Sequence, residues 1–151
     1  MATIRSFEEL DVWQMARVFC REIYKITKAG EFARDFDLSK QIRKSSGSIM
    51  DNIAEGFERN GRKEFIQFLS IAKGSSGESR SQLYRALDCE YVTETVFQKL
   101  HSDCTEISRK LSSLISYLQK SEYRGSKFQE PELTYEVEEH NSMQIDFERE
   151  P

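Results

Sequence analysis

The sequence predicts an all-α protein, an antiparallel up-down bundle of four helices, and three observations support this prediction. The chain has 151 residues, which is the length of one ordinary domain. Residues 1–130 contain no proline, and the whole chain has only seven glycines, whereas a turn-rich β protein needs more of both. Apolar residues recur at alternating spacings of three and four in four separate stretches, as they do on one face of an α-helix.

The first helix is expected over residues 8–28. Ser6 is a candidate N-cap, and Glu9 three residues later would complete a capping box. Gly30 marks the expected end of the helix. The apolar stripe consists of Val12, Trp13, Ala16, Phe19, Cys20, Ile23, Ile26 and Thr27.

The second helix follows a short link that contains Phe32 and Phe36, and it is expected to end near Glu58. Either Asp35 or Asp37 is placed to cap it. The residues that share its apolar side are Leu38, Ile42, Ser45, Ile49, Asn52, Ile53 and Phe57.

A third helix is expected over residues 62–89, with Asn60 as its cap. Its apolar face holds Phe65, Phe68, Leu69, Ala72, Ser76, Ser79, Leu83, Ala86 and Leu87. Gly74 and Gly77 lie inside it, and each costs about 1 kcal/mol relative to alanine in a helix. Either the helix breaks there, or small residues let the second helix, which has its own small cluster at 45–48, approach closely. We favour close approach.

The fourth helix, over residues 93–120, has the most regular pattern. Its apolar positions alternate by three and four without interruption, as in a coiled-coil seam. These positions are Phe97, Leu100, Cys104, Ile107, Leu111, Leu114 and Leu118.

The charge divides the chain into two parts, a bundle over residues 1–120 and a tail over residues 121–151. The tail has nine acidic and three basic residues, so its net charge is −6. Since the formal net charge of the whole chain is −4, the bundle has a net charge of +2. The tail is therefore expected to be a solvated, flexible extension.

Several classes of protein are disfavoured. Cys20, Cys89 and Cys104 are odd in number and far apart, which predicts free thiols and a cytoplasmic location. No apolar stretch is long enough for a membrane span, so no membrane partner is expected.

Catalytic and metal-binding motifs are also missing. A di-iron bundle needs Glu-x-x-His pairs, but Gln98 stands three residues before His101 and Val137 three before His140. No zinc, Cys-x-x-Cys or nucleophile-elbow motif occurs. We therefore expect no metal, no cofactor and no enzymatic activity.

Asn52, Glu55 and Gly56 form a conspicuous polar motif in the second helix. Asn52 and Glu55 are three residues apart and share a helix face. They either hold a ligand, such as a phosphate, or form an interhelical hydrogen-bonding pair that fixes the register of the bundle. We favour the structural role, in which Gly56 permits close packing or the exit of the helix.

Basic residues provide the remaining functional signal. Four of them recur at spacings of four, four and three along the first helix, and the others flank the second helix. Such a stripe is either an ordinary solvated face or a surface that binds nucleic-acid phosphates without reading bases. The candidate nucleic-acid-binding residues are Arg17, Arg21, Lys25, Lys28, Lys40, Arg43, Lys44, Arg59, Arg62 and Lys63.

Three segments resemble a known family. Residues 41–56 read QIRKSSGSIMDNIAEG, residues 63–75 read KEFIQFLSIAKGS with Glu78 following, and residues 7–16 read FEELDVWQMA. Together they are similar to the signatures of the bacterial four helix bundle proteins, first noticed within intervening sequences of 23S ribosomal RNA genes. The resemblance covers about residues 6–120.

The resemblance implies an up-down bundle that assembles as a homopentameric ring. A related branch, the accessory protein of diversity-generating retroelements, implies binding to nucleic acid and to a reverse transcriptase. The alternative to nucleic-acid binding is therefore an adaptor for a protein partner encoded nearby. Surplus apolar residues also favour self-association, namely Val12, Phe19, Ile26, Ile66, Ile71, Val96 and Ile115.

Overall fold

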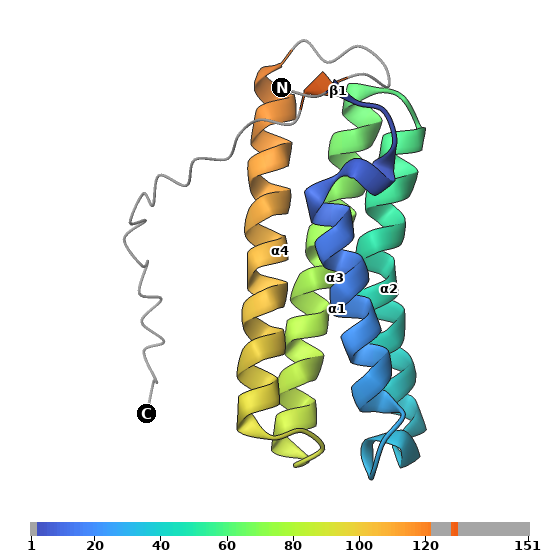
Figure 1. Cartoon of the computed structure of the whole chain (residues 1–151), viewed down its shortest axis with the longest axis vertical. Helices are drawn as coiled ribbons and strands as arrows, with labels where there is room; N and C mark the ends of the chain where they lie inside the picture. The colour runs from blue at the N-terminus through green and yellow to red at the C-terminus, as the bar shows by residue number, and fades with distance from the viewer. Residues whose placement is uncertain (1–2, 122–127, 130–151) are drawn as a thin grey trace, which may run out of the picture.

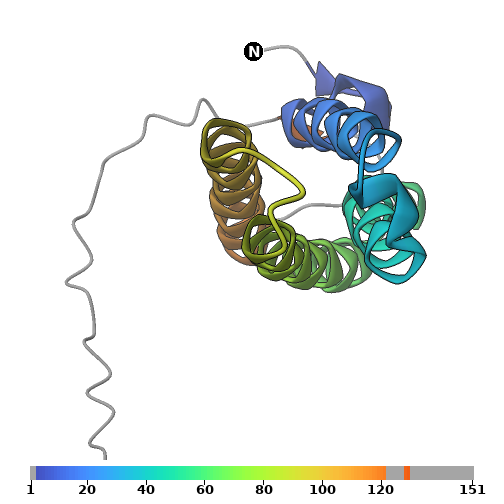
Figure 2. The same ribbon diagram turned by 90° about the horizontal axis from the view of Figure 1, so that it is seen from below.

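Four long α-helices run alternately up and down the molecule, as the sequence predicts (Figure 1). They are α1 (Asp11–Thr27), α2 (Phe36–Glu58), α3 (Arg62–Asp88) and α4 (Glu94–Lys120). Short 3-10 turns at Phe7–Glu9 and Phe32–Arg34 precede α1 and α2. The computed structural model describes residues 3–121 and 128–129. Seen along the bundle, each helix lies beside the next one in the chain, which confirms the predicted fold class (Figure 2).

The apolar stripes of the four helices meet in one core. All seven predicted seam positions of α4 are buried. Val12 and Phe19 are buried as well, at 3% and 2% exposure, so our interpretation that they exceed what the core of one chain needs was wrong. Ile26, Ile66, Val96 and Ile115 pack against the same core, and Ile71 is the member of that set that is exposed. The single chain therefore uses most of the apolar residues from which we argued self-association.

Two of the predicted helix caps were wrong and one was right. Ser6 precedes a 3-10 turn and makes no side-chain cap bond, and α1 begins only at Asp11. Asp35 caps α2, because its Oδ1 accepts a hydrogen bond from the backbone N–H of Leu38 at 3.0 Å. Asn60 does not cap α3, whose N-cap is Gly61. It instead takes a left-handed φ of 60° in the turn after α2, a conformation that asparagine tolerates.

Serines, rather than glycines, form the close contacts between α2 and α3. The α3 helix runs without a break through Gly74 and Gly77, and a Cβ added at Gly47 or Gly74 would meet nothing within 4 Å. These glycines therefore do not serve close approach, and that part of the prediction was wrong. The contacts are made by the pair Ser45–Ser79 at 2.8 Å and the pair Ser48–Ser75 at 2.9 Å.

A short antiparallel ribbon joins the two ends of the described chain. Residues Thr3–Ile4 (β1) pair with Phe128–Gln129 (β2), with Ile4 opposite Phe128. The sequence did not predict this pairing. The remainder of the predicted acidic tail after Ser121 lies outside the described residues. Among the helices described, none is long and apolar enough to cross a membrane.

Candidate nucleic-acid interface

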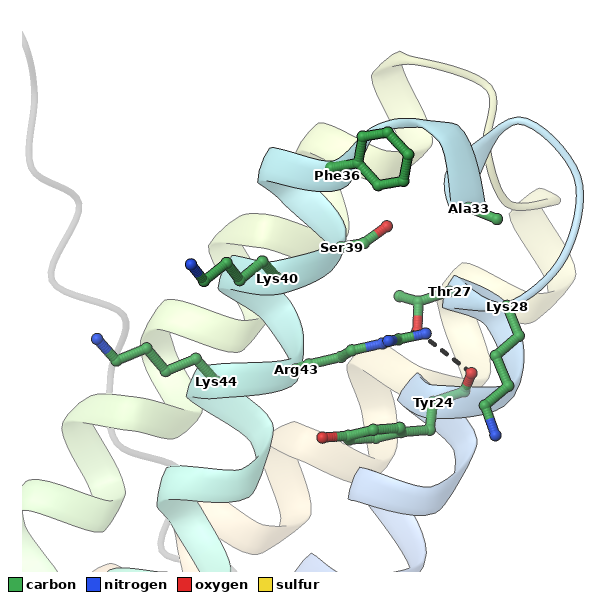
Figure 3. A pocket seen from close by; sticks show the side chains of 9 residues that line it. All are labelled: Tyr24, Thr27, Lys28, Ala33, Phe36, Ser39, Lys40, Arg43 and Lys44. Carbon is green, nitrogen blue, oxygen red and sulfur yellow. Dashed lines mark hydrogen bonds between the residues drawn. The ribbon is translucent and has the colours of Figure 1, made fainter.

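An open pocket of about 700 Å³ lies where α1 ends and α2 begins (Figure 3). Four of its lining residues are basic, two are aromatic, and none is acidic. We call it the basic pocket. Its lining residues are Tyr24, Thr27, Lys28, Ala33, Phe36, Ser39, Lys40, Arg43 and Lys44.

Several packing and hydrogen-bonding contacts hold the loop between α1 and α2 in place, and this loop forms part of the rim of the basic pocket. Gly30 takes a φ of 59°, which allows the chain to reverse after α1. Phe32 is buried and stacks on Tyr91 with 5.2 Å between the ring centroids. The hydroxyl of Ser39 donates to the backbone oxygen of Phe32 at 2.6 Å.

Asp35 connects this loop to the turn between α3 and α4. Its Oδ2 accepts a hydrogen bond from the Tyr91 hydroxyl at 3.0 Å, and its Oδ1 caps α2. The cap bond from Leu38 and the bond from Tyr91 both lower the pKa of Asp35. The same carboxylate raises the pKa of Tyr91 to about 12. The side chain of Asp35 is thus committed to structural bonds.

Arg43 is held in place from two sides. Its Nε donates to the Thr27 hydroxyl at 2.7 Å, and its guanidinium carbon lies 4.8 Å from the centroid of the Tyr24 ring (Figure 3). The Thr27 hydroxyl in turn donates to the backbone oxygen of Ile23 at 2.8 Å. Both contacts orient the planar guanidinium at the pocket wall, a geometry suited to a phosphate or to a stacked ring.

The other three cations of the basic pocket are exposed lysines. Lys28 comes from the end of α1, while Lys40 and Lys44 stand one turn apart on α2 (Figure 3). Ion pairs within the described residues involve Lys25, Arg59, Lys99 and Lys110, but not Arg43 or these three lysines. Four positive groups thus surround one concavity, and no carboxylate of the described residues forms an ion pair with any of them.

The remaining candidate residues do not join this site. Arg17, Arg21 and Lys25 are exposed along α1, where Lys25 pairs with Glu22 at 3.0 Å. Arg17 lies over the ring of Trp13 at 5.9 Å. These residues extend the positive surface of α1 beyond the basic pocket.

Arg59, Arg62 and Lys63 lie at the other end of α2 (Figure 1). At about 1.5 Å per residue, the 23 residues of α2 separate the two ends by roughly 34 Å. Arg59 pairs with Glu55 at 2.9 Å, and Arg62 donates to the backbone oxygen of Ser121 at 3.1 Å. The ten predicted residues therefore form no single interface.

The polar motif of α2 divides into separate roles. Asn52 donates to the backbone oxygen of Ser48 at 2.7 Å and to its hydroxyl at 2.8 Å. Glu55 is exposed and pairs with Arg59. The bonds of both residues thus stay within α2 and its C-cap, so our prediction that Asn52 and Glu55 form an interhelical pair was wrong. Gly56 is buried where α2 meets α3, and a Cβ there would lie 2.6 Å from the Cβ of Phe68.

Sequence reasoning missed Tyr24, Thr27 and Phe36 as members of the site. Tyr24 lies outside the buried stripe of α1 and is 41% exposed, and Phe36 is 80% exposed. For Tyr24, the available signal was its position off the apolar stripe of α1 and beside Lys25. Thr27 gave no signal, because it belongs to the buried stripe.

Comparison with known proteins identifies the family. No curated protein matches the chain. A crystal structure of a protein with unknown function from the S23 ribosomal protein family, from Bacteroides thetaiotaomicron, is similar to it, with 32% identity and a TM-score of 0.63. That match covers 69% of this chain and 97% of the other. The model of the 23S rRNA-intervening sequence protein family matches residues 8–113, and the chain therefore belongs to this family.

Proposed function

We propose that this protein is a non-enzymatic, self-associating helical bundle that binds nucleic acid through the basic pocket. The observation that carries the proposal is the group of Lys28, Lys40, Arg43 and Lys44 around one concave site, without ion-pair partners among the described residues. Phosphate backbones supply the matching charge, and each neutralised phosphate releases counterions. Affinity is therefore expected to fall steeply as salt is added.

A charge reversal tests this function. The double variant Lys40→Glu, Lys44→Glu is expected to bind a labelled RNA or DNA oligonucleotide about tenfold more weakly, and with a shallower salt dependence, because two phosphate contacts are lost. Fluorescence anisotropy titrations at several salt concentrations measure both quantities. Neither lysine is buried, so the fold is expected to tolerate the changes.

The matched control is Lys73→Glu, Arg109→Glu, which makes the same change of charge at exposed positions of α3 and α4. It is expected to bind almost as well as the unaltered protein, because neither residue lines the basic pocket. Equal losses in both double variants would contradict a localised site. Absence of binding to any oligonucleotide would contradict the function and favour the alternative, an adaptor for a protein partner such as a reverse transcriptase.

The non-enzymatic part of the proposal rests on the sequence, in which the catalytic and metal-binding motifs considered above are missing. In the described part of the chain, no three His, Cys, Asp or Glu side chains are grouped so that they could hold a metal ion. Burial raises the pKa of the Cys104 thiol to about 12, so this thiol is protonated at neutral pH and is a poor nucleophile.

Self-association is supported by apolar side chains that remain at the surface. Val18 and Ile71 are 45% and 44% exposed. We expect light scattering coupled to gel filtration to give a mass several times the 17.7 kDa of one chain, as in the pentameric ring that the resemblance implies. The variant Val18→Lys is expected to lower that mass, because a buried contact would have to accept a charge. A monomer at micromolar concentration would contradict self-association.

A further inference from the structure

We propose that the basic pocket takes a single-stranded segment of nucleic acid, with one base stacked on Phe36 and the adjoining phosphates held by Lys40, Arg43 and Lys44. This inference rests on the proposed function and specifies its ligand. It combines two observations, an exposed aromatic ring and cations that form no ion pair with any other described residue, and both belong to one concavity.

Phe36 presents an unusually exposed aromatic ring at the basic pocket. Its side chain is 80% exposed, which is far more than any other large apolar residue among those described, the next being Tyr84 at 49%. The ring does not stabilise the core, yet its exposure to water is unfavourable. A flat apolar surface at the rim of a positively charged pocket is the arrangement by which proteins stack the bases of single strands.

The opposite side of the basic pocket offers a second planar group. In Figure 3, Phe36 lies at one end of the site and the stacked pair of Arg43 and Tyr24 at the other, with Ser39 and Thr27 between them. Arg43 is oriented by Thr27, so its terminal NH₂ groups are left to meet a phosphate or the face of a base. The volume of about 700 Å³ falls in the range of pockets that hold ligands the size of a nucleotide.

The stacking geometry selects single strands over duplexes. In a duplex, the faces of the bases are covered by their neighbours, so Phe36 can reach a base face only in a loop, an end or a single strand. The hydroxyls of Ser39 and Thr27 already donate to backbone oxygens. With few free polar groups to read base edges, the site is expected to show only weak sequence preference.

The test compares single-stranded and duplex oligonucleotides of the same sequence in anisotropy titrations with the full chain. The single strand is expected to bind more tightly. Phe36→Ala is expected to weaken single-strand binding about tenfold, because a stacked base is lost, and to leave the salt dependence and duplex binding unchanged. Phe36→Trp is expected to retain the affinity, whereas Phe36→Leu, which is apolar but not aromatic, is expected to lose it.

The control variant is Tyr84→Ala, which removes another exposed aromatic ring, on α3 and outside the basic pocket. It is expected to bind like the unaltered protein. Two results would each overturn this inference while leaving the proposed function intact: full single-strand affinity in Phe36→Ala, or equal affinity for single strand and duplex. If the Lys40→Glu, Lys44→Glu variant also bound normally, the proposed function itself would be wrong.

Discussion

Replacing Gly56 by alanine is expected to lower the free energy of unfolding by about 2 kcal/mol. The added methyl group would lie 2.6 Å from the Cβ of Phe68 and 3.4 Å from the backbone oxygen of Phe65. Cβ is the fixed base of the Phe68 side chain, so α2 and α3 must move apart to accept the methyl group. Urea denaturation followed by far-UV circular dichroism, at one protein concentration, measures the change.

The same substitution at Gly47, in the same helix, is the matched control. Nothing lies within 4 Å of a Cβ at this position or at Gly74 in α3. Alanine at either Gly47 or Gly74 is expected to stabilise the protein by about 0.5–1 kcal/mol, because alanine restricts the unfolded chain more than glycine does. A stabilising effect of alanine at all three positions would mean that α2 and α3 do not approach closely at Gly56.

The positions of these glycines relative to the contact between α2 and α3 could not be predicted from the sequence. The four helices and the buried face of α4 could be predicted, because periodic burial is a local property that the spacing of apolar residues records. Which small residues lie at a helix crossing depends on the rotation of two helices about their axes. The clusters around Gly47 and Gly74 therefore suggested close approach at glycines, although serines make the contacts and the close glycine is Gly56.

The basic pocket shows the same limit for function. Lys28, Lys40, Arg43 and Lys44 could be named as candidates from charge alone, and the structure brings them together. Phe36 could not be assigned to the site, because its exposure follows from the way the loop after Gly30 reverses and places the first turn of α2.

The separation of the two groups of cations at the ends of α2 could be predicted, because the sequence places them near the start and after the end of a long helix. The cluster at residues 59–63 lies at the other end of the bundle from the pocket cations (Figure 1). A straight helix separates residues steadily along its axis, so cations at its two ends form two separate surfaces.

Removing the hydroxyl of Ser45 is expected to cost about 2 kcal/mol of stability. A serine hydroxyl has one proton, which Ser45 donates to Oε1 of Gln82 at 2.6 Å, so its contact with the Ser79 hydroxyl at 2.8 Å is one in which it accepts. Both partners come from α3 and are buried, at 4% and 0% exposure. In Ser45→Ala the Gln82 oxygen loses its donor and the Ser79 hydroxyl its acceptor, in a place that water does not reach.

The cost is expected to depend on which partner is removed. Gln82→Leu removes the buried amide, and the Ser45 hydroxyl can then donate to the backbone oxygen of Ile42 at 3.2 Å. Because no buried group loses its only hydrogen bond, the loss of stability is expected to be small. The double variant Ser45→Ala, Gln82→Leu is therefore expected to lose less stability in urea denaturation than the sum of the two single variants, because both polar partners are removed together.

The control is Ser70→Ala, at an exposed serine that bonds only within α3, and this change is expected to be nearly neutral. If Ser45→Ala were as mild as Ser70→Ala, the serine contacts between α2 and α3 would contribute little to stability, and apolar burial alone would hold the two helices together.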